Sequence, residues 1–291
     1  MSIFDQKVIK YEMKPLSSLE KVFPDETPVY RMECQMLSGL WGETVSFQVA
    51  YTGDFVMRER LDVRVVSELA EHVHVRTVEM VPVGRATNGI VDDNYLKTTS
   101  GLYPDLLKDL KDGKVIVYSR QWRSLWVDVD ITNEIPAGEY EIELQLIKEG
   151  EVVCSAKQKV TVIGTELPKL DIMHTEWMHA DCLADYYHVE VFSEEHWKLL
   201  ENYFQEYVKR DCNMMLTPLF TSPLDTAIGL ERTTCQLIDV EVKDGEYVFG
   251  FEKLKRWIDL CKKCGIEYFE MSHLFSQWGA KYAPKVVATV N

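Results

Sequence analysis

The sequence lacks long apolar runs and an excess of basic residues, and both absences limit what the protein can contact. No stretch of about 18 apolar residues occurs, and residues 1–7 contain no apolar signal core. The 32 Lys and Arg residues are outnumbered by 47 Asp and Glu residues, which gives a formal net charge of −15. We therefore expect no membrane partner, no nucleic-acid partner and a cytoplasmic location.

The sequence also lacks a recognisable disulfide framework. Its seven cysteines are odd in number and scattered, which is typical of reduced, buried thiols. Cys261 and Cys264 have the spacing of metal ligands, but no second pair at a similarly tight spacing accompanies them. They fall at the end of a predicted helix, just before Gly265, where a redox pair is not expected. We predict a structural role for both.

Common cofactor and nucleophile motifs are absent as well. Neither a GxxxxGK nor a GxGxxG loop occurs, and there is no GxSxG elbow. His174, His179 and His273 could in principle hold a metal ion, but strand alternation would point His174 away from Trp177. We expect no metal and no cofactor.

Residues 1–167 are predicted to form a β-sandwich domain of the immunoglobulin-like or carbohydrate-binding type. Several short runs alternate polar and apolar residues and are separated by turn signals, as in antiparallel sheets with one wet face. These runs are 43–51, 71–76, 125–131, 139–146 and 152–162. Residues 88–113 interrupt the pattern and are predicted to be a long loop, in which Asp92 and Asp93 are solvated or turn-forming. Residues 165–168 are predicted to be a linker.

Residues 168–291 are predicted to form part of a (β/α) barrel with about three strands. Strands are expected at 170–177, 212–218 and 266–271, with helices after Ser193 and before Gly265 and a hairpin at Asp244-Gly245. A complete barrel needs about 250 residues. We therefore expect this chain to be the N-terminal part of a longer protein. An open barrel edge also predicts self-association.

Polar and aromatic side chains gather at the C-terminal ends of these predicted strands, which meet at one rim of a barrel. Indole faces with fixed hydrogen-bonding groups suit a sugar. Structural roles remain alternatives: core aromatics, a structural histidine, an ion pair at Glu270, and a loop salt bridge for Glu231-Arg232. The predicted substrate-binding residues are Trp177, His179, Asp181, Thr217, Glu270, His273, Gln277 and Trp278.

Several strings resemble glycoside hydrolase family 123 and related domains of unknown function. The resemblance runs from about residue 25 onward and rests on residues 126–129 leading to 136–140, on 213–218 and on 229–232. Its most specific string, followed by Ala283-Pro284-Lys285, is His273-Leu274-Phe275-Ser276-Gln277-Trp278-Gly279-Ala280.

The resemblance implies a β-N-acetylgalactosaminidase-type hydrolase that uses substrate assistance. The sugar's own N-acetyl oxygen is then the nucleophile, an Asp orients it, and an adjacent Glu is the general acid/base. The only Asp-Glu dipeptide here is Asp25-Glu26, in the N-terminal segment. The resemblance therefore implies that the catalytic pair lies beyond Asn291, and no catalytic acid is assigned. Glu270 is a weaker stand-in because it lacks the adjacent Asp.

Three hypotheses remain open at this point. The chain could be the N-terminal part of an N-acetylhexosaminide hydrolase, inactive by itself. It could be a non-catalytic carbohydrate-binding or scaffold module whose contacts come from the sandwich. It could also be a complete enzyme assembled from half barrels by oligomerisation.

Overall fold

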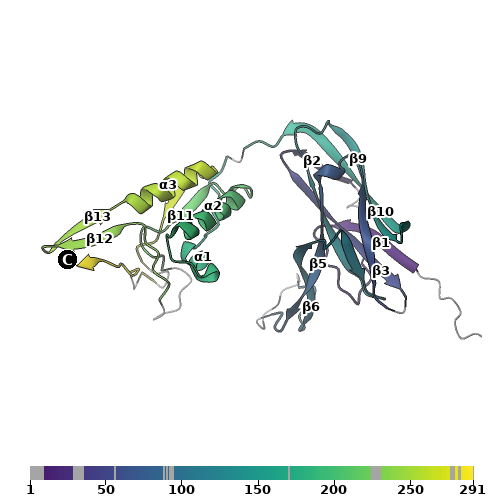
Figure 1. The fold of residues 1–291 in the computed structure, drawn as a ribbon, viewed down its shortest axis with the longest axis horizontal. Coiled ribbons are helices and arrows are strands. Elements are labelled where there is room, and N and C mark those ends of the chain that lie inside the picture. The colour runs from purple at the N-terminus through teal and green to yellow at the C-terminus, as the bar shows by residue number, and fades with distance from the viewer. Residues whose placement is uncertain are drawn as a thin grey trace, which may run out of the picture. The chain divides into compact units, whose positions relative to one another are not determined.

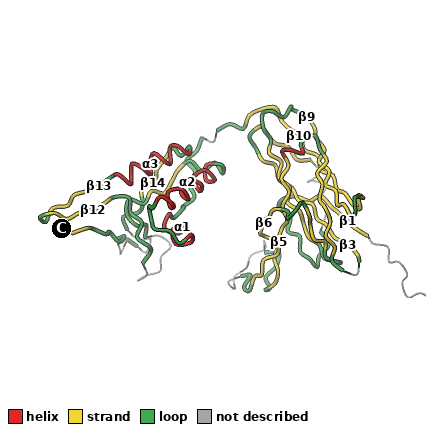
Figure 2. The backbone as a smooth tube through the Cα atoms, in the orientation of Figure 1, coloured by secondary structure: helices red, strands yellow, loops and turns green. Residues whose placement is uncertain are grey.

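The chain divides into two compact units, Met1–Pro168 and Lys169–Asn291, a boundary one residue beyond the predicted one. This computed structural model describes residues 10–28, 36–55, 57–87, 89, 91, 95–169, 171–223, 231–275, 279–280 and 283–290. Strands dominate the first unit, where the described residues contain one short 3₁₀ turn, Ala70–His72. Three helices accompany shorter strands in the second unit (Figure 2).

The first unit contains two five-stranded sheets (Figure 1). All neighbouring strands are antiparallel except β2 and β10, which pair in parallel. One sheet has the order β1(Lys10–Ser17), β3(Thr44–Asp54), β8(Arg123–Asp130), β5(Val73–Val83), β6(Gly101–Asp109). The other has the order β2(Met36–Trp41), β10(Glu151–Glu166), β9(Gly138–Lys148), β4(Glu59–Val66), β7(Lys114–Val117).

One hydrophobic core joins the two sheets of the first unit. Strand alternation sends every second side chain to the same face. Apolar residues of β8 and β9 occupy these alternate positions and are fully buried in the same cluster. These residues are Leu125, Val127, Val129, Ile142, Leu144 and Leu146. The period-two pattern of the sequence therefore corresponds to one buried face per sheet, and the chain is β-rich as predicted.

The predicted loop at 88–113 is wrong in its second half, because β6 occupies Gly101–Asp109. Pro104 interrupts the strand pattern, but β6 is an edge strand and its pairing with β5 shifts register between Glu79 and Met80. A proline is tolerated at such an edge or bulge because the missing N–H breaks no ladder on the open side. Asp92 and Asp93 lie outside the described residues. The predicted linker at 165–168 is partly strand, since β10 extends to Glu166.

The second unit places helices beside two small sheets (Figure 1). Its helices are α1(Ala180–Tyr187), α2(Glu194–Val208) and α3(Glu252–Cys264). Strands β11(Met214–Thr217) and β14(Tyr268–Met271) pair in parallel. A three-stranded sheet has the order β13(Glu246–Gly250), β12(Asp239–Lys243), β15(Thr289–Val290). The hydrophobic core of the second unit includes Trp257 and Phe204, whose ring centroids are 5.1 Å apart.

The local signals at the element ends of this unit are confirmed. The Ser193 side chain accepts a hydrogen bond from the His196 amide at 3.2 Å and caps α2. Gly265 ends α3 at φ 106°, a left-handed conformation that favours glycine. Asp244 and Gly245 turn the β12–β13 hairpin at φ 52° and 82°, both positive as a type I′ turn requires.

The strand predicted at 170–177 is wrong, because the described residues 171–177 are not in a strand. This segment lies beside the start of β11, where the His174 carbonyl accepts from the Asn213 and Met214 amides at 3.0 and 3.1 Å. The Asn213 side chain then takes the place of the backbone hydrogen bonds that a further strand would make. Its Oδ1 accepts from the His174 amide and its Nδ2 donates to the Ile172 carbonyl, each at 2.8 Å. The predicted three-stranded sheet therefore has two strands among the described residues.

Candidate functional site

Trp177 and Glu270 meet at the C-terminal end of the parallel β11–β14 pair. The indole Nε1 of Trp177 donates to Oε2 of Glu270 at 2.9 Å, although the Trp177 side chain is still 48% exposed. Glu270 lies on β14 opposite Leu216, one residue before the end of each strand. The described part of the chain offers this carboxylate no other hydrogen-bond or ion-pair partner. A half-exposed indole and an oriented carboxylate therefore share an open surface.

His273 completes this group, which we call the rim cluster: Trp177, Glu270 and His273. The imidazole meets the Trp177 ring edge-to-face, with centroids 5.4 Å apart and planes at 75°. Its Nδ1 is shielded from solvent and has no hydrogen-bond partner among the described residues. A buried polar atom without a partner is unfavourable, and a ligand that reached this nitrogen would supply the missing bond.

Asp181 is held in a buried ion pair. Arg232 donates from Nε to Oδ2 at 2.8 Å and from Nη2 to Oδ1 at 3.0 Å, a bidentate arrangement with both side chains largely buried. The same Nη2 contacts the Cys182 sulfur at 3.1 Å. Burial opposes the charge on Arg232, but its bonds to Asp181 outweigh that effect and raise the pKa of the guanidinium. Asp181 thus fixes the start of α1 to the loop that carries Arg232.

The predicted loop salt bridge between Glu231 and Arg232 is replaced by two separate pairs. Arg232 binds Asp181, as described above. Glu231 accepts from Lys285 at 2.8 Å on the surface, and this hydrogen bond lowers the pKa of the Glu231 carboxyl. Each pair therefore ties the same loop to a different segment of the unit.

The remaining predicted site residues are placed differently. Thr217 is fully buried, and its hydroxyl donates to the Met215 carbonyl at 3.1 Å. His179 is the residue before α1, and its carbonyl accepts from the Cys182 amide at 3.1 Å. Gln277 and Trp278 lie outside the described residues. The structure therefore brings Trp177, Glu270 and His273 together and assigns Thr217 a local structural bond.

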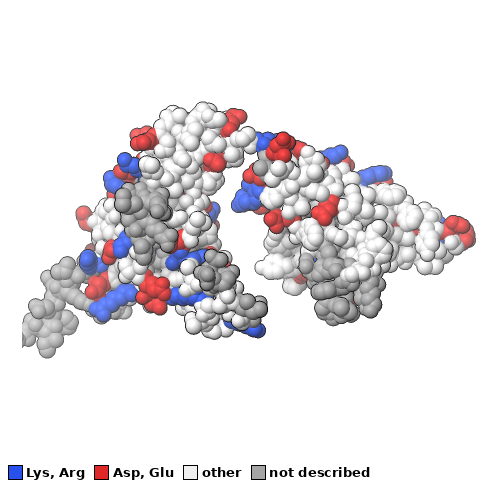
Figure 3. Space-filling view, turned by 180° about the vertical axis from the view of Figure 1, so that it is seen from behind, with Lys and Arg blue, Asp and Glu red and all other residues white. Residues whose placement is uncertain are grey.

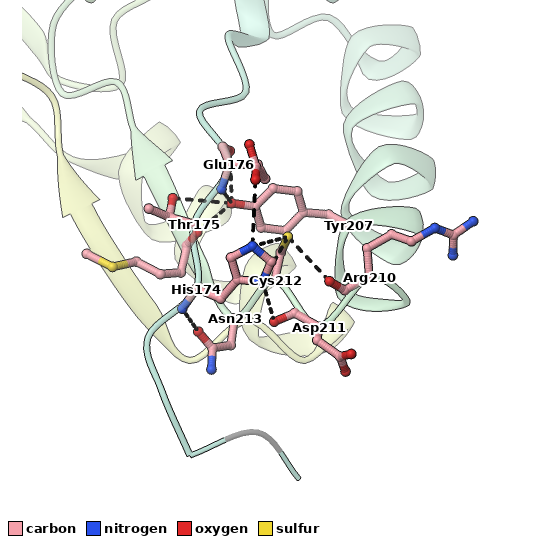
Figure 4. Close-up of polar contacts among 9 residues, drawn as sticks. His174, Thr175, Glu176, Tyr207, Arg210, Asp211, Cys212 and Asn213 are labelled. Atoms are coloured by element: carbon pink, nitrogen blue, oxygen red, sulfur yellow. Dashed lines mark hydrogen bonds and ion pairs between the residues drawn. The ribbon is translucent and has the colours of Figure 1, made fainter. Parts of the chain in front are cut away.

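A second polar cluster lies at the opposite end of β11, around the hydroxyl of Tyr207 (Figure 4). This hydroxyl contacts the Glu176 amide at 2.8 Å, the Glu176 carbonyl at 2.9 Å and the Met214 carbonyl at 2.7 Å. The Thr175 hydroxyl is 3.3 Å away. We call this the Tyr207 cluster; with its neighbour Asn213 it fastens the segment before α1 to the start of β11.

Cys212, His174 and Glu176 lie in a row within the same region, as a nucleophilic triad would (Figure 4). The Cys212 sulfur is 3.8 Å from Nδ1 of His174, and Nε2 of His174 is 3.7 Å from the Glu176 carboxylate. However, burial of Cys212, and then the nearby Glu176 and Asp211 charges, raise the pKa of the thiol. A protonated, buried thiol is a poor nucleophile. This row is therefore a structural contact.

The Cys261 and Cys264 pair behaves as a structural element. Cys261 is fully buried in the core and burial strongly raises its pKa. Burial raises the pKa of Cys264 too. The described ranges contain no group of three or more His, Cys, Asp or Glu side chains arranged to hold a metal ion. They contain no helix long and apolar enough to cross a membrane. Figure 3 shows acidic and basic side chains interspersed over the visible surface of each unit.

Comparison with known proteins identifies the family. Residues 177–290 match the family model described as glycoside hydrolase 123, catalytic domain. This part of the chain belongs to glycoside hydrolase family 123. The match begins at Trp177 and includes the whole rim cluster, so the resemblance found in the sequence is confirmed.

The fold comparison extends the similarity to both units. A solved family 123 glycoside hydrolase from Clostridium perfringens, described for glycolipid glycan hydrolysis, matches with a TM-score of 0.64 at 13% identity. The match covers 94% of this chain and 51% of that chain, so this chain spans about half of its length. At this identity the similarity concerns the fold alone.

Weaker matches add nothing to this assignment. A β-glucosidase from Listeria innocua has a TM-score of 0.25 at 10% identity, covering 55% of this chain and 17% of that one. The N-terminal domain of PorA has a TM-score of 0.25 at 11% identity, covering 50% of this chain and 99% of that domain. Both similarities are too weak to support a statement about the fold. No curated protein sequence matches the chain.

Sequence inspection missed how two residues organise this unit. Arg232 binds Asp181, but their distance along the chain hides the pair. His196 is fully buried in α2 and links Ala180 to Phe192: its Nε2 contacts the Ala180 carbonyl at 3.0 Å, and its Nδ1 accepts from the Phe192 amide at 2.9 Å. The only available signal was the position of His196 in the first turn of the capped helix.

Proposed function

We propose that the protein is a glycoside hydrolase acting on N-acetylhexosaminides, with β-N-acetylgalactosaminides as the first candidates. One observation supports this most directly: the rim cluster lies within the family 123 match and combines an exposed indole, an oriented carboxylate and an imidazole nitrogen without a partner. The indole of Trp177 offers an apolar face to the sugar ring. Glu270 and His273 offer hydrogen bonds to its hydroxyl or acetamide groups.

The chemical step proposed is substrate-assisted hydrolysis. The acetamide oxygen attacks the anomeric carbon, the glycosidic bond breaks, and water later opens the cyclic intermediate. An adjacent Asp-Glu pair must orient the acetamide and protonate the leaving oxygen. We propose that this pair lies outside residues 1–291 and that the rim cluster binds the sugar rather than cleaving the bond.

The test measures sugar binding and turnover by the same preparation. N-acetylgalactosamine should bind, and galactose, which lacks the acetamide, should bind at least about tenfold more weakly because one buried polar contact is lost. Trp177→Ala should abolish binding. Tyr186→Ala also removes an aromatic ring, from a residue on α1 that is 74% exposed, and should leave binding intact.

Turnover of an aryl N-acetyl-β-galactosaminide distinguishes the roles of the carboxylates. The 291-residue chain should bind this substrate without releasing the aryl group. Turnover that disappears in Glu270→Gln would instead make Glu270 the general acid and refute the proposal that the catalytic pair lies elsewhere. Binding that persists in Trp177→Ala but fails after substitutions in the first unit would favour a carbohydrate-binding module.

A further inference from the structure

The first unit contains a cavity of about 490 Å³ that the proposed hydrolase function does not use. Its lining comes from β5 and β6 and from the segments around Phe23 and Tyr95–Lys97. This volume lies within the range of small-molecule sites. Most of its lining is apolar: Phe23, Val81, Val83, Tyr95, Leu96 and Tyr103 are the principal side chains.

Two of the three aromatic residues of this cavity, Phe23 and Tyr103, are engaged with protein partners, whereas Tyr95 is 46% exposed. The Lys97 ammonium lies 3.9 Å from the centroid of the Phe23 ring, and Tyr103 packs edge-to-face against Phe23 at 5.7 Å. The Tyr103 hydroxyl donates to the Thr99 carbonyl at 2.5 Å. A sugar needs a free aromatic face and free hydrogen-bonding groups, and here the Phe23 face and the Tyr103 hydroxyl proton are both taken. The free lining that remains is mainly aliphatic.

The charges at the cavity are paired with one another. Lys97 binds Glu26 at 2.8 Å and Asp25 at 3.3 Å. Lys21 donates to the Pro104 carbonyl at 3.1 Å and lies 4.0 Å from Asp105. An anionic ligand would face these three carboxylates, and a cationic ligand would face the two ammonium groups. The electrostatics therefore favour an uncharged ligand.

One exposed leucine belongs to the cavity lining, and two more lie on β6 outside it. Leu96, which lines it, is 71% exposed, and Leu102 and Leu106 on β6 are 53% and 57% exposed. An exposed leucine in an apolar lining is a feature of binding surfaces, and the β6 leucines provide a matched comparison outside the lining.

We propose that this cavity binds an uncharged amphiphile, with an alkyl chain against Val81, Val83 and Leu96 and a neutral polar head at the paired lysines. The alkyl chain replaces water along the aliphatic wall, which is the source of the affinity. The neutral head meets ammonium and carboxylate groups that already compensate one another. This inference concerns the first unit and does not depend on the hydrolase proposal.

Alkyl glucosides of increasing chain length test the proposal on the full chain by isothermal titration, below their critical micelle concentrations. Octyl β-D-glucoside should bind saturably at one site. Each methylene that leaves water tightens binding about fourfold, so octyl should bind about fifteenfold more tightly than hexyl. Methyl β-D-glucoside, which has the same head and no chain, should not bind measurably. Equal affinity for the methyl and octyl compounds would identify a sugar site and overturn the proposal.

Variants locate the bound chain. Ala86→Trp, at a half-buried lining position, should weaken octyl glucoside binding at least about tenfold by filling the cavity. Leu96→Asp should weaken it several-fold without a risk to folding, because the side chain is exposed. Leu106→Asp makes the same change on β6 outside the lining and should bind like the wild type. Unchanged binding in both lining variants, or an equal loss in the control, would show non-specific adsorption and refute the proposal.

Discussion

The two ends of β11 carry polar clusters of similar composition and different completeness. At the N-terminal end, the Tyr207 hydroxyl contacts the backbone of Glu176 and Met214, and both ends of the Asn213 amide are used. At the C-terminal end, the rim cluster leaves Nδ1 of His273 without a partner among the described residues. The family match at residues 177–290 includes Tyr207 and Asn213 as well as the rim cluster, so the contrast rests on the hydrogen bonds alone.

The difference shows which polar clusters can act on a ligand. A hydrogen bond that the fold already satisfies stabilises the native state and offers nothing further. An oriented but incomplete set of donors and acceptors is less favourable for folding and available for binding. Asp181 illustrates the point, because Arg232 satisfies both of its oxygens.

Breaking the buried Asp181–Arg232 pair should destabilise the second unit most. Arg232→Met leaves the Asp181 carboxylate buried without its cation, which typically costs about 3–5 kcal/mol of unfolding free energy. The double variant Asp181→Leu/Arg232→Met removes both charges and should recover most of that loss. Denaturant unfolding measures both. If Arg232→Met instead abolished sugar binding at unchanged stability, the pair would belong to the ligand site and the contrast would fail.

Tyr207→Phe should have the next largest effect. The change removes only the hydroxyl and leaves the Glu176 and Met214 backbone groups without their partner, at a cost of about 1–3 kcal/mol. Tyr203→Phe is the matched control, because among the described residues its hydroxyl contacts only the Tyr187 hydroxyl, at 3.0 Å on the surface. That variant should lose less than about 0.5 kcal/mol. Equal losses in the two variants would show that the cluster in Figure 4 has no special structural role.

Burial of His196 predicts that folding stability depends on pH, with an effect of intermediate size. Burial lowers the pKa of His196 in the folded state, and its Nδ1 must stay unprotonated to accept from Phe192. Above the unfolded pKa of about 6.5, His196 is neutral in both the folded and the unfolded protein, and its contribution to stability is complete. As the pH falls below that value, the unfolded state binds a proton first and stability drops by at most about 1.4 kcal/mol per pH unit.

Hydrogen exchange of α2 amides, corrected for intrinsic rates, can isolate this effect from acid titration elsewhere. His196→Gln should flatten the pH dependence between about pH 5 and pH 7. His188→Asn is the control, since His188 is exposed after α1 in a left-handed conformation that asparagine tolerates. The same slope in the wild type and His196→Gln would exclude His196 as its source.

Local sequence patterns predicted most of the architecture for a physical reason. Alternation and turn residues act between near neighbours, so β3, β8, β9, β10 and both capped helices were accessible from the sequence. The edge strand β6 was missed because Pro104 is tolerated only through its position and its bulge. The strand at 170–177 was wrongly predicted because the Asn213 side chain, distant in sequence, takes the place of the ladder.

Three of the predicted site residues lie together, and Asp181 and Thr217 bind other partners. Glu270 and His273 lie at the end of β14 as predicted, and Trp177 meets them although the segment before it is not a strand. The ion pair of Asp181 with Arg232 could not be predicted, since no periodic pattern in the sequence connects the two residues. The buried Thr217 hydroxyl shows the same limit: position at a strand end does not determine which way a side chain points.

The smallest effect on stability is expected at the rim cluster itself. Glu270→Gln keeps the shape of the side chain and removes a charge that no described cation balances, so the unfolding free energy should change by less than about 0.5 kcal/mol. Binding of N-acetylgalactosamine should nevertheless weaken about tenfold, because a charged acceptor becomes a neutral one. A stability loss comparable with that of Tyr207→Phe, without a change in binding, would make the rim cluster a second structural cluster. The opposite result, with binding lost and folding intact, is what an incomplete cluster aimed at a sugar requires.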